Sequence, residues 1–158
     1  MPRLQSVAAA ALLVFALSPA WAADTAPPAA KTDSLSAARA QIAQKNWPAA
    51  VAELKKVNDT SNADWNNLMG YSLRKSATPD YAAAETFYNE ALRLNPKHRG
   101  ALEYSGELYL IMNDLPKAES RLAALDKACT LPCAEHTELK KTIERYKANG
   151  NKYVAAPW

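Results

Sequence analysis

The chain has 158 residues, 19 basic and 16 acidic side chains, and a formal net charge of +3. Lysine and arginine are scattered along it, which argues against nucleic acid and against an anionic membrane surface as partners. It has only four glycines, no glycine-rich phosphate loop, and no serine placed as in a strand-turn-helix nucleophile motif. We therefore expect no enzyme activity and no cofactor.

Residues 1–22 have the pattern of a secretory signal peptide. Arg3 supplies a positive start, residues 7–17 are an apolar run of 11, and Ala20-Trp21-Ala22 has the small-x-small form of a cleavage site. The run is shorter than the roughly 20 residues that span a bilayer. We predict cleavage near Ala22, a periplasmic location and no stable membrane insertion afterwards. An uncleaved anchor or a buried helix is the alternative.

The Ala-, Pro- and Thr-rich residues 23–33 are predicted to be a disordered linker. Residues 34–62 are predicted to form a first helix pair. Its first helix runs from Leu35 to Gln44, and apolar residues mark its second at helical spacing: Trp47, Ala50, Leu54 and Val57.

Residues 63–98 are predicted to form a second helix pair. Pro79 and Asp80 stop its first helix and start its second, which runs from Tyr81 to Leu94. Small residues, an aromatic residue and a proline occupy characteristic places in this pair: Gly70, Ala84, Tyr88, Ala91 and Pro96.

Residues 99–132 are predicted to form a third pair, with a turn at Asn113-Asp114. Gly106, Tyr109 and Ala118 occupy positions in this pair that correspond to those of the small and aromatic residues in the second pair. Residues 133–148 are expected to be a capping helix with an apolar stripe of Leu139, Ile143 and Tyr146. Asn149-Gly150-Asn151 ends that helix, and residues 149–158 are a short tail whose Trp158 could dock on the helices.

The second and third pairs repeat a pattern. Gly70 and Gly106 are 36 residues apart, and Ala84 and Ala118 are 34 apart. Small residues at fixed places, with an aromatic residue four positions later, resemble the tetratricopeptide-repeat family. Trp65 departs from that family, because it lies one position before the usual tryptophan. The alternative is an unrelated alanine-rich bundle.

The resemblance implies an all-α, right-handed superhelical stack of about three helix pairs and a capping helix. It also implies a concave face, lined by the first helices of the pairs, that holds a protein or peptide partner. Counting phase from the two glycines assigns six residues to this groove: Asn67, Tyr71, Arg74, Glu103, Glu107 and Leu110. Arg39 and Ile42 are further candidates. The alternative is ordinary solvated helix surface.

Tyr71 and Arg74 are expected to grip an extended segment by aromatic contact and a charge-assisted hydrogen bond. Glu103 and Glu107 stand where a clamp for a C-terminal carboxylate would need cations, so capture of such a terminus is disfavoured. The two glutamates also lack a third ligand for a metal.

Cys129 and Cys133 are the only cysteines, and in an exported protein such a pair predicts a disulfide. Free thiols and a redox-active pair are the alternatives. His98 and His136 are isolated, with no ligand at metal spacing, so no metal site is expected.

The predicted function is that of an exported adaptor or scaffold that binds a protein or peptide. A structural subunit of an envelope assembly, or a thiol-redox protein using the cysteine pair, are the alternatives.

Overall fold

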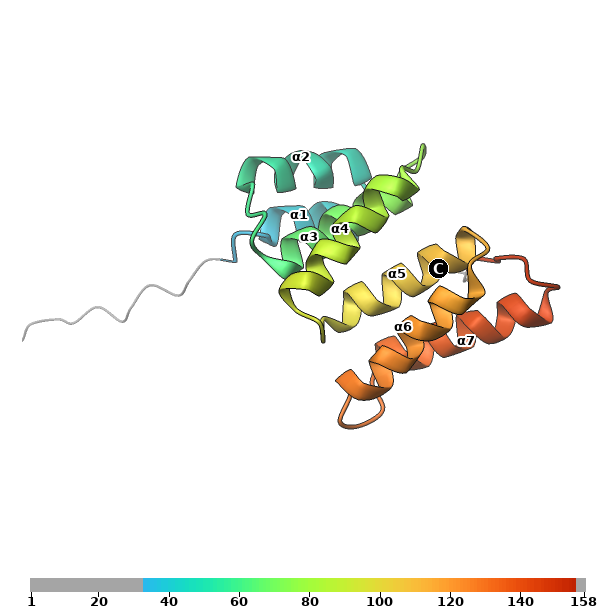
Figure 1. Ribbon diagram of the computed structural model, residues 1–158. Helices are drawn as coiled ribbons and strands as arrows, with labels where there is room; N and C mark the ends of the chain where they lie inside the picture. Colours follow the sequence, from blue (N-terminus) through green and yellow to red (C-terminus); the bar gives the residue numbers. More distant parts are fainter. Residues whose placement is uncertain (1–32, 156–158) are drawn as a thin grey trace, which may run out of the picture. The chain divides into compact units, whose positions relative to one another are not determined.

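A computed structural model describes residues 33–155, and this part of the chain is all α-helical, with no strand (Figure 1). The predicted signal peptide, nearly all of the predicted linker and Trp158 lie outside the described residues. No helix within residues 33–155 is long and apolar enough to cross a membrane. The helices are α1 (Ser36–Ala43), α2 (Trp47–Val57), α3 (Ala63–Lys75), α4 (Tyr81–Leu94), α5 (Arg99–Ile111), α6 (Leu115–Ala128) and α7 (Ala134–Ala148).

Helices α3, α4 and α6 begin where short polar side chains accept backbone hydrogen bonds. Asn62 Oδ1 accepts from the amides of Asp64 and Trp65 at the start of α3. Asp80 and Asp114 do the same for α4 and α6, each with one bond. Such N-caps stabilise a helix by about 1 kcal/mol each. The Asp80 cap explains why the predicted start of α4 at Tyr81 agrees with the observed one.

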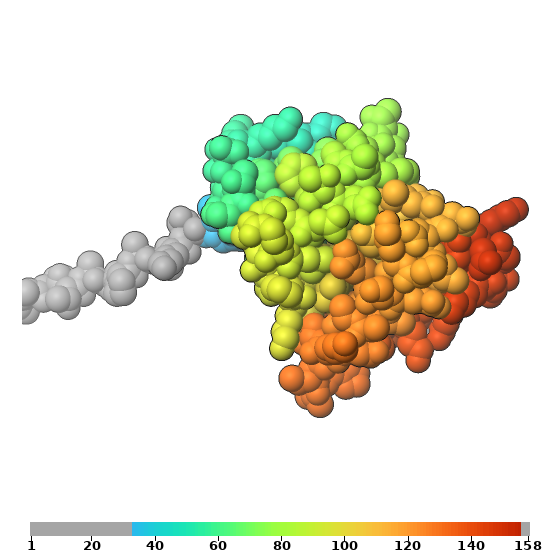
Figure 2. Space-filling model, in the orientation of Figure 1, coloured from blue at the N-terminus to red at the C-terminus, as the bar shows by residue number. Residues whose placement is uncertain are grey.

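The helices pack in consecutive pairs, α1 with α2, α3 with α4, and α5 with α6. Further contacts join α1 to α3, α3 to α5, and α5 to α7. These four helices therefore form one layer, and α2, α4 and α6 lie beside it. The surface that faces the viewer in Figure 2 is formed largely by α2, α4 and α6.

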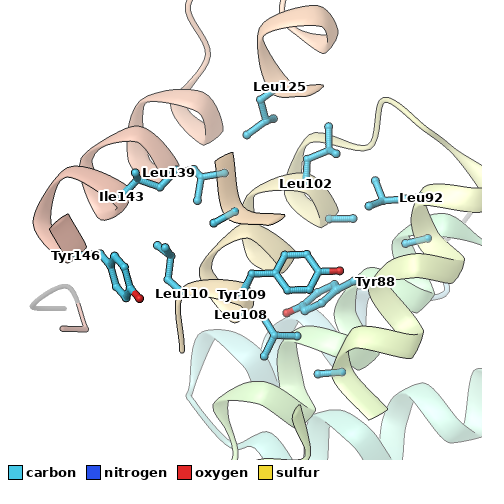
Figure 3. Packing of buried hydrophobic residues seen from close by; sticks show 14 residues of the cluster. Tyr88, Leu92, Leu102, Leu108, Tyr109, Leu110, Leu125, Leu139, Ile143 and Tyr146 are labelled. Carbon is cyan, nitrogen blue, oxygen red and sulfur yellow. The ribbon is translucent and has the colours of Figure 1, made fainter. Parts of the chain in front are cut away.

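The core is uneven along the chain. Its larger cluster joins α4, α5, α6 and α7, with Tyr88, Leu108 and Leu125 fully buried (Figure 3). A smaller cluster joins α1, α2 and α3. Helix α1 contributes a single buried residue, Ala38, and α2 contributes two. Most of the apolar burial is therefore at the C-terminal end.

Small residues allow close helix contacts in both halves of the chain. A Cβ atom at Gly70 would lie 2.8 Å from Tyr88 Cε1 and 3.1 Å from the Ala84 carbonyl oxygen, both in α4. At Gly106 the nearest atoms belong to Leu139 of α7, at 2.6 Å. Gly106 therefore makes room for α7. Five further residues of the repeat pattern are buried: Ala84, Tyr88, Ala91, Tyr109 and Ala118. Pro96 is exposed in the turn after α4.

Trp65, which departs from the family pattern, is anchored by a polar contact. Its indole Nε1 donates a 2.7 Å hydrogen bond to the Leu54 carbonyl, and its ring is buried. The ring also meets Phe87 edge to face. It therefore ties α3 to both α2 and α4.

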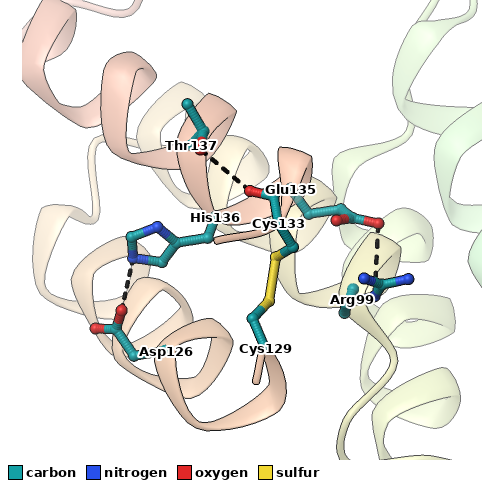
Figure 4. The surroundings of a disulfide bond; sticks show 7 residues. All are labelled: Arg99, Asp126, Cys129, Cys133, Glu135, His136 and Thr137. Atoms are coloured by element: carbon teal, nitrogen blue, oxygen red, sulfur yellow. Dashed lines mark hydrogen bonds and ion pairs between the residues drawn. A yellow bond between two sulfur atoms is a disulfide. The ribbon is translucent and has the colours of Figure 1, made fainter. Parts of the chain in front are cut away.

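The predicted disulfide is confirmed, so the free-thiol alternative is wrong. Cys129 and Cys133 are bonded, with their Cα atoms 6.0 Å apart (Figure 4). Beside the bond, His136 Nε2 lies 2.7 Å from an Asp126 carboxylate oxygen. Both contacts join the end of α6 to the start of α7. The disulfide therefore fastens the last helix to the third pair.

Candidate functional site

Three half-buried aromatic rings form a row across α2, α3 and α5. Trp47 begins α2, Tyr71 lies in α3 and Tyr104 lies in α5. The ring centroids of Trp47 and Tyr71 are 5.8 Å apart, and those of Tyr71 and Tyr104 are 4.6 Å apart. We refer to these three residues as the aromatic row. Sequence analysis placed only Tyr71 in the groove, although Tyr104 follows it by 33 residues, close to one repeat length.

Arg74 lies beneath this row and is buried. Its Nη1 donates a 2.7 Å hydrogen bond to Glu107 Oε2, and the two side chains are 2% and 12% exposed. The guanidinium carbon also lies 5.6 Å from the ring centroids of both Tyr71 and Tyr104. The expectation that Arg74 is open to a partner is therefore wrong, because an ion pair and two cation–π contacts hold it inside the chain.

Electrostatics keeps this buried guanidinium charged. Burial alone would lower the pKa of Arg74, but Tyr88 and the Glu107 carboxylate favour the charged form and raise that pKa. Nε and Nη2 of Arg74 have no hydrogen-bond partner among the described residues. The centre of the site is therefore a buried, neutralised ion pair.

The C-terminal tail approaches the same place. Helix α7 ends at Ala148, and Gly150 and Asn151 both have a positive φ, which reverses the chain. Tyr153 then packs, half-buried, against the larger core cluster. Burial raises the pKa of Tyr153, and Glu107 and Arg74 are among the charges that act on it. Tyr153 thus lies near the Arg74–Glu107 pair.

Of the other residues predicted to line the groove, some are buried and some are at least partly exposed. Asn67 and Leu110 are 6% and 1% exposed, so the prediction that they line an open groove is wrong. Glu103 is partly buried near the pair. Arg39 is exposed but binds Asp64 at 3.1 Å, and Ile42 packs against the smaller core cluster. The structure therefore brings together Tyr71, Arg74, Glu103 and Glu107.

A pocket of about 320 Å³ opens at one end of the aromatic row. Trp47 and Tyr71 form part of its lining, together with Lys45 and Lys75. Lys45 lies in the turn between α1 and α2 with a φ of 56°, and Lys75 is the last residue of α3. Burial lowers the pKa of Lys75, and the positive charges of Arg74 and Lys45 lower it further. Sequence analysis missed both lysines.

Glu103 gives the site a pH dependence. Its pKa is raised to about 8, chiefly by burial and then by the nearby Glu107 and Glu135 carboxylates. The folded protein therefore holds this proton more tightly than the unfolded chain, and the free energy of unfolding should fall as pH rises from about 4.5 to about 8. One such group contributes at most about 1.4 kcal/mol per pH unit.

Urea unfolding across this pH range measures the effect. Glu103→Gln should remove that part of the slope and stabilise the protein at the alkaline end. The exposed carboxylate Glu144 of α7 provides the control, since Glu144→Gln should leave the slope unchanged. Equal slopes in the wild type and in Glu103→Gln would show that Glu103 does not titrate as described.

The histidines have structural contacts. His98 Nδ1 accepts a hydrogen bond from the Ala101 amide at the start of α5, and its Nε2 lies 2.9 Å from Asp64. His136 contacts Asp126, as described above. Within residues 33–155, no group of three or more His, Cys, Asp or Glu side chains could hold a metal ion.

Comparison with known proteins does not assign the chain to a family. No family model matches it, and no curated protein matches it.

Proposed function

We propose that this protein is an exported tetratricopeptide-type module that binds an extended segment of another protein. The binding face is formed by α1, α3 and α5 together with Trp47 at the start of α2, and the role is that of an adaptor or scaffold. In this proposal the helix pairs continue into a right-handed superhelix. The pattern that recurs after 34 to 36 residues supports it, as does the order of helix contacts.

The observation that carries the proposal is the aromatic row. Large aromatic side chains with a polar tip are the residues most often found as anchors in protein interfaces. Here three of them lie side by side and remain partly accessible. The buried ion pair beneath holds the rings of Tyr71 and Tyr104 in place, so a partner meets a preformed surface and loses little free energy in ordering it.

Substitution of the row tests this proposal. Tyr71→Ala and Tyr104→Ala should each weaken capture of periplasmic proteins about tenfold, since a contact that dominates an interface contributes more than about 1 kcal/mol. Affinity capture followed by quantitative mass spectrometry identifies the partner, and titration with the purified partner then gives the loss. Arg74→Glu is unsuitable here, because it would disrupt the buried pair.

Lys141→Glu on α7 is the matched control, because Lys141 is exposed and distant in sequence from the row. All variants should keep the wild-type helical circular dichroism. If Lys141→Glu abolishes capture and the two tyrosine variants do not, the partner-binding face is wrong. The protein would then be better explained as an assembly subunit that uses its end surface.

A further inference from the structure

The pocket beside the aromatic row combines flat apolar walls with positive charge. Trp47 and Tyr71, whose rings meet at an interplanar angle of 74°, both line the pocket. Lys45 and Lys75 supply the ammonium groups. Pockets of this type hold the hydrocarbon part of a side chain against the rings and pair its charged end with the lysines.

Positive charge dominates this end of the site. Besides the two lysines, α2 begins at Trp47 without a side-chain N-cap, so the positive end of its dipole is at the pocket. The Glu107 carboxylate is engaged by Arg74 at 2.7 Å. A basic side chain would therefore be repelled here, whereas a carboxylate would be attracted.

We propose that this pocket binds an acidic side chain of the partner segment, next to the aromatic row. The proposal rests on the proposed function and specifies the chemistry of the partner. It differs from capture of a C-terminal carboxylate by the third helix pair, which Glu103 and Glu107 disfavour. The lysines lie instead in the α1–α2 turn and at the end of α3.

Three labelled peptides test the proposal by fluorescence anisotropy with the purified protein. They share the frame Gly-Ser-Pro-X-Tyr-X-Pro-Ser-Gly, where X is Glu, Gln or Lys. The Glu peptide should bind about tenfold more tightly than the Gln peptide, which corresponds to about 1.4 kcal/mol. The difference in affinity between the Glu and Gln peptides should become smaller at high salt, because screening weakens exposed charge pairs.

Charge reversal provides the decisive comparison. In the double variant Lys45→Glu and Lys75→Glu, the preference should invert, so that the Lys peptide binds more tightly than the Glu peptide. Lys45→Glu alone should reduce the preference, and it keeps the test valid if the double variant fails to fold, because Lys45 is exposed in a turn. Lys140→Glu with Lys141→Glu, both exposed on α7, should leave the preference unchanged.

Three results would overturn the proposal: no binding of the Glu peptide up to about 1 mM, equal binding of the Glu and Gln peptides, or a preference that survives reversal of the lysines. Competition by free glutarate as effective as that of the unlabelled Glu peptide would also overturn it, since it would indicate a small-molecule site.

The two proposals can fail separately. If Tyr71→Ala and Tyr104→Ala abolish partner capture while reversal of the lysines does not, the binding face stands and the acidic subsite is wrong.

Discussion

Arg74→Ala should lower the free energy of unfolding by about 3–5 kcal/mol, the typical cost of removing one partner from a buried ion pair. The Glu107 carboxylate, only 12% exposed, would remain without its 2.7 Å partner. The rings of Tyr71 and Tyr104 would also lose the guanidinium that lies 5.6 Å from each of their centroids. Denaturant unfolding followed by circular dichroism measures the loss, with the slope of the transition unchanged.

Two comparisons separate burial from the ion pair itself. Arg93 pairs with Glu90 at the same 2.7 Å but on the surface, so Arg93→Ala should change stability little. Replacing both buried partners, Arg74→Met with Glu107→Leu, should recover most of the loss, because apolar residues of similar size are often tolerated at such positions. If Arg74→Ala costs no more than Arg93→Ala, the buried pair does not support the fold.

Gly70→Leu should destabilise the protein by about 3 kcal/mol or more, because it overpacks a fully buried contact. A Cβ atom alone would lie 2.8 Å from the ring of Tyr88 and 3.1 Å from the backbone oxygen of Ala84. Neither can move easily, since Tyr88 is fully buried and Ala84 lies within α4. Thermal unfolding measures the loss.

Gly100→Ala is the matched control for this prediction. It lies in α5, and its Cβ atom would come no closer than 3.3 Å to another residue, at the side-chain amide of Asn67. Because its contact is with a side chain at 3.3 Å and not with backbone, this variant should change the free energy of unfolding far less than Gly70→Leu. Equal losses at Gly70 and Gly100 would contradict the packing argument.

Local signals in the sequence were sufficient to predict the helices. Asp80 and Asp114 are N-caps that the sequence displays directly, and α4 was predicted with its observed bounds. The cysteine pair was similarly accessible, because Cys129 and Cys133 are separated by one short turn. These features depend on residues that are neighbours in the chain, so no knowledge of the packing was needed.

The candidate site depends on contacts between distant residues, and there the sequence was less informative. Arginine is rarely buried without a partner, so Arg74 was assumed to be exposed. Its partner Glu107 lies 33 residues away, on a different helix. One signal was nevertheless present: Arg74 follows Gly70 by four positions, so both lie on the same side of α3, and Gly70 faces α4.

The first helix pair has the smallest share of the core, with one buried residue in α1 and two in α2, against seven in α5. Because local opening follows buried contacts, the amides of α1 and α2 should exchange with solvent before those of α5. Lys45 and Trp47 belong to this pair, so its opening removes one side of the pocket while α3 to α7 stay folded. A ligand in the pocket would therefore raise exchange protection selectively in α1 and α2, and recognition would be linked to the folding of that pair.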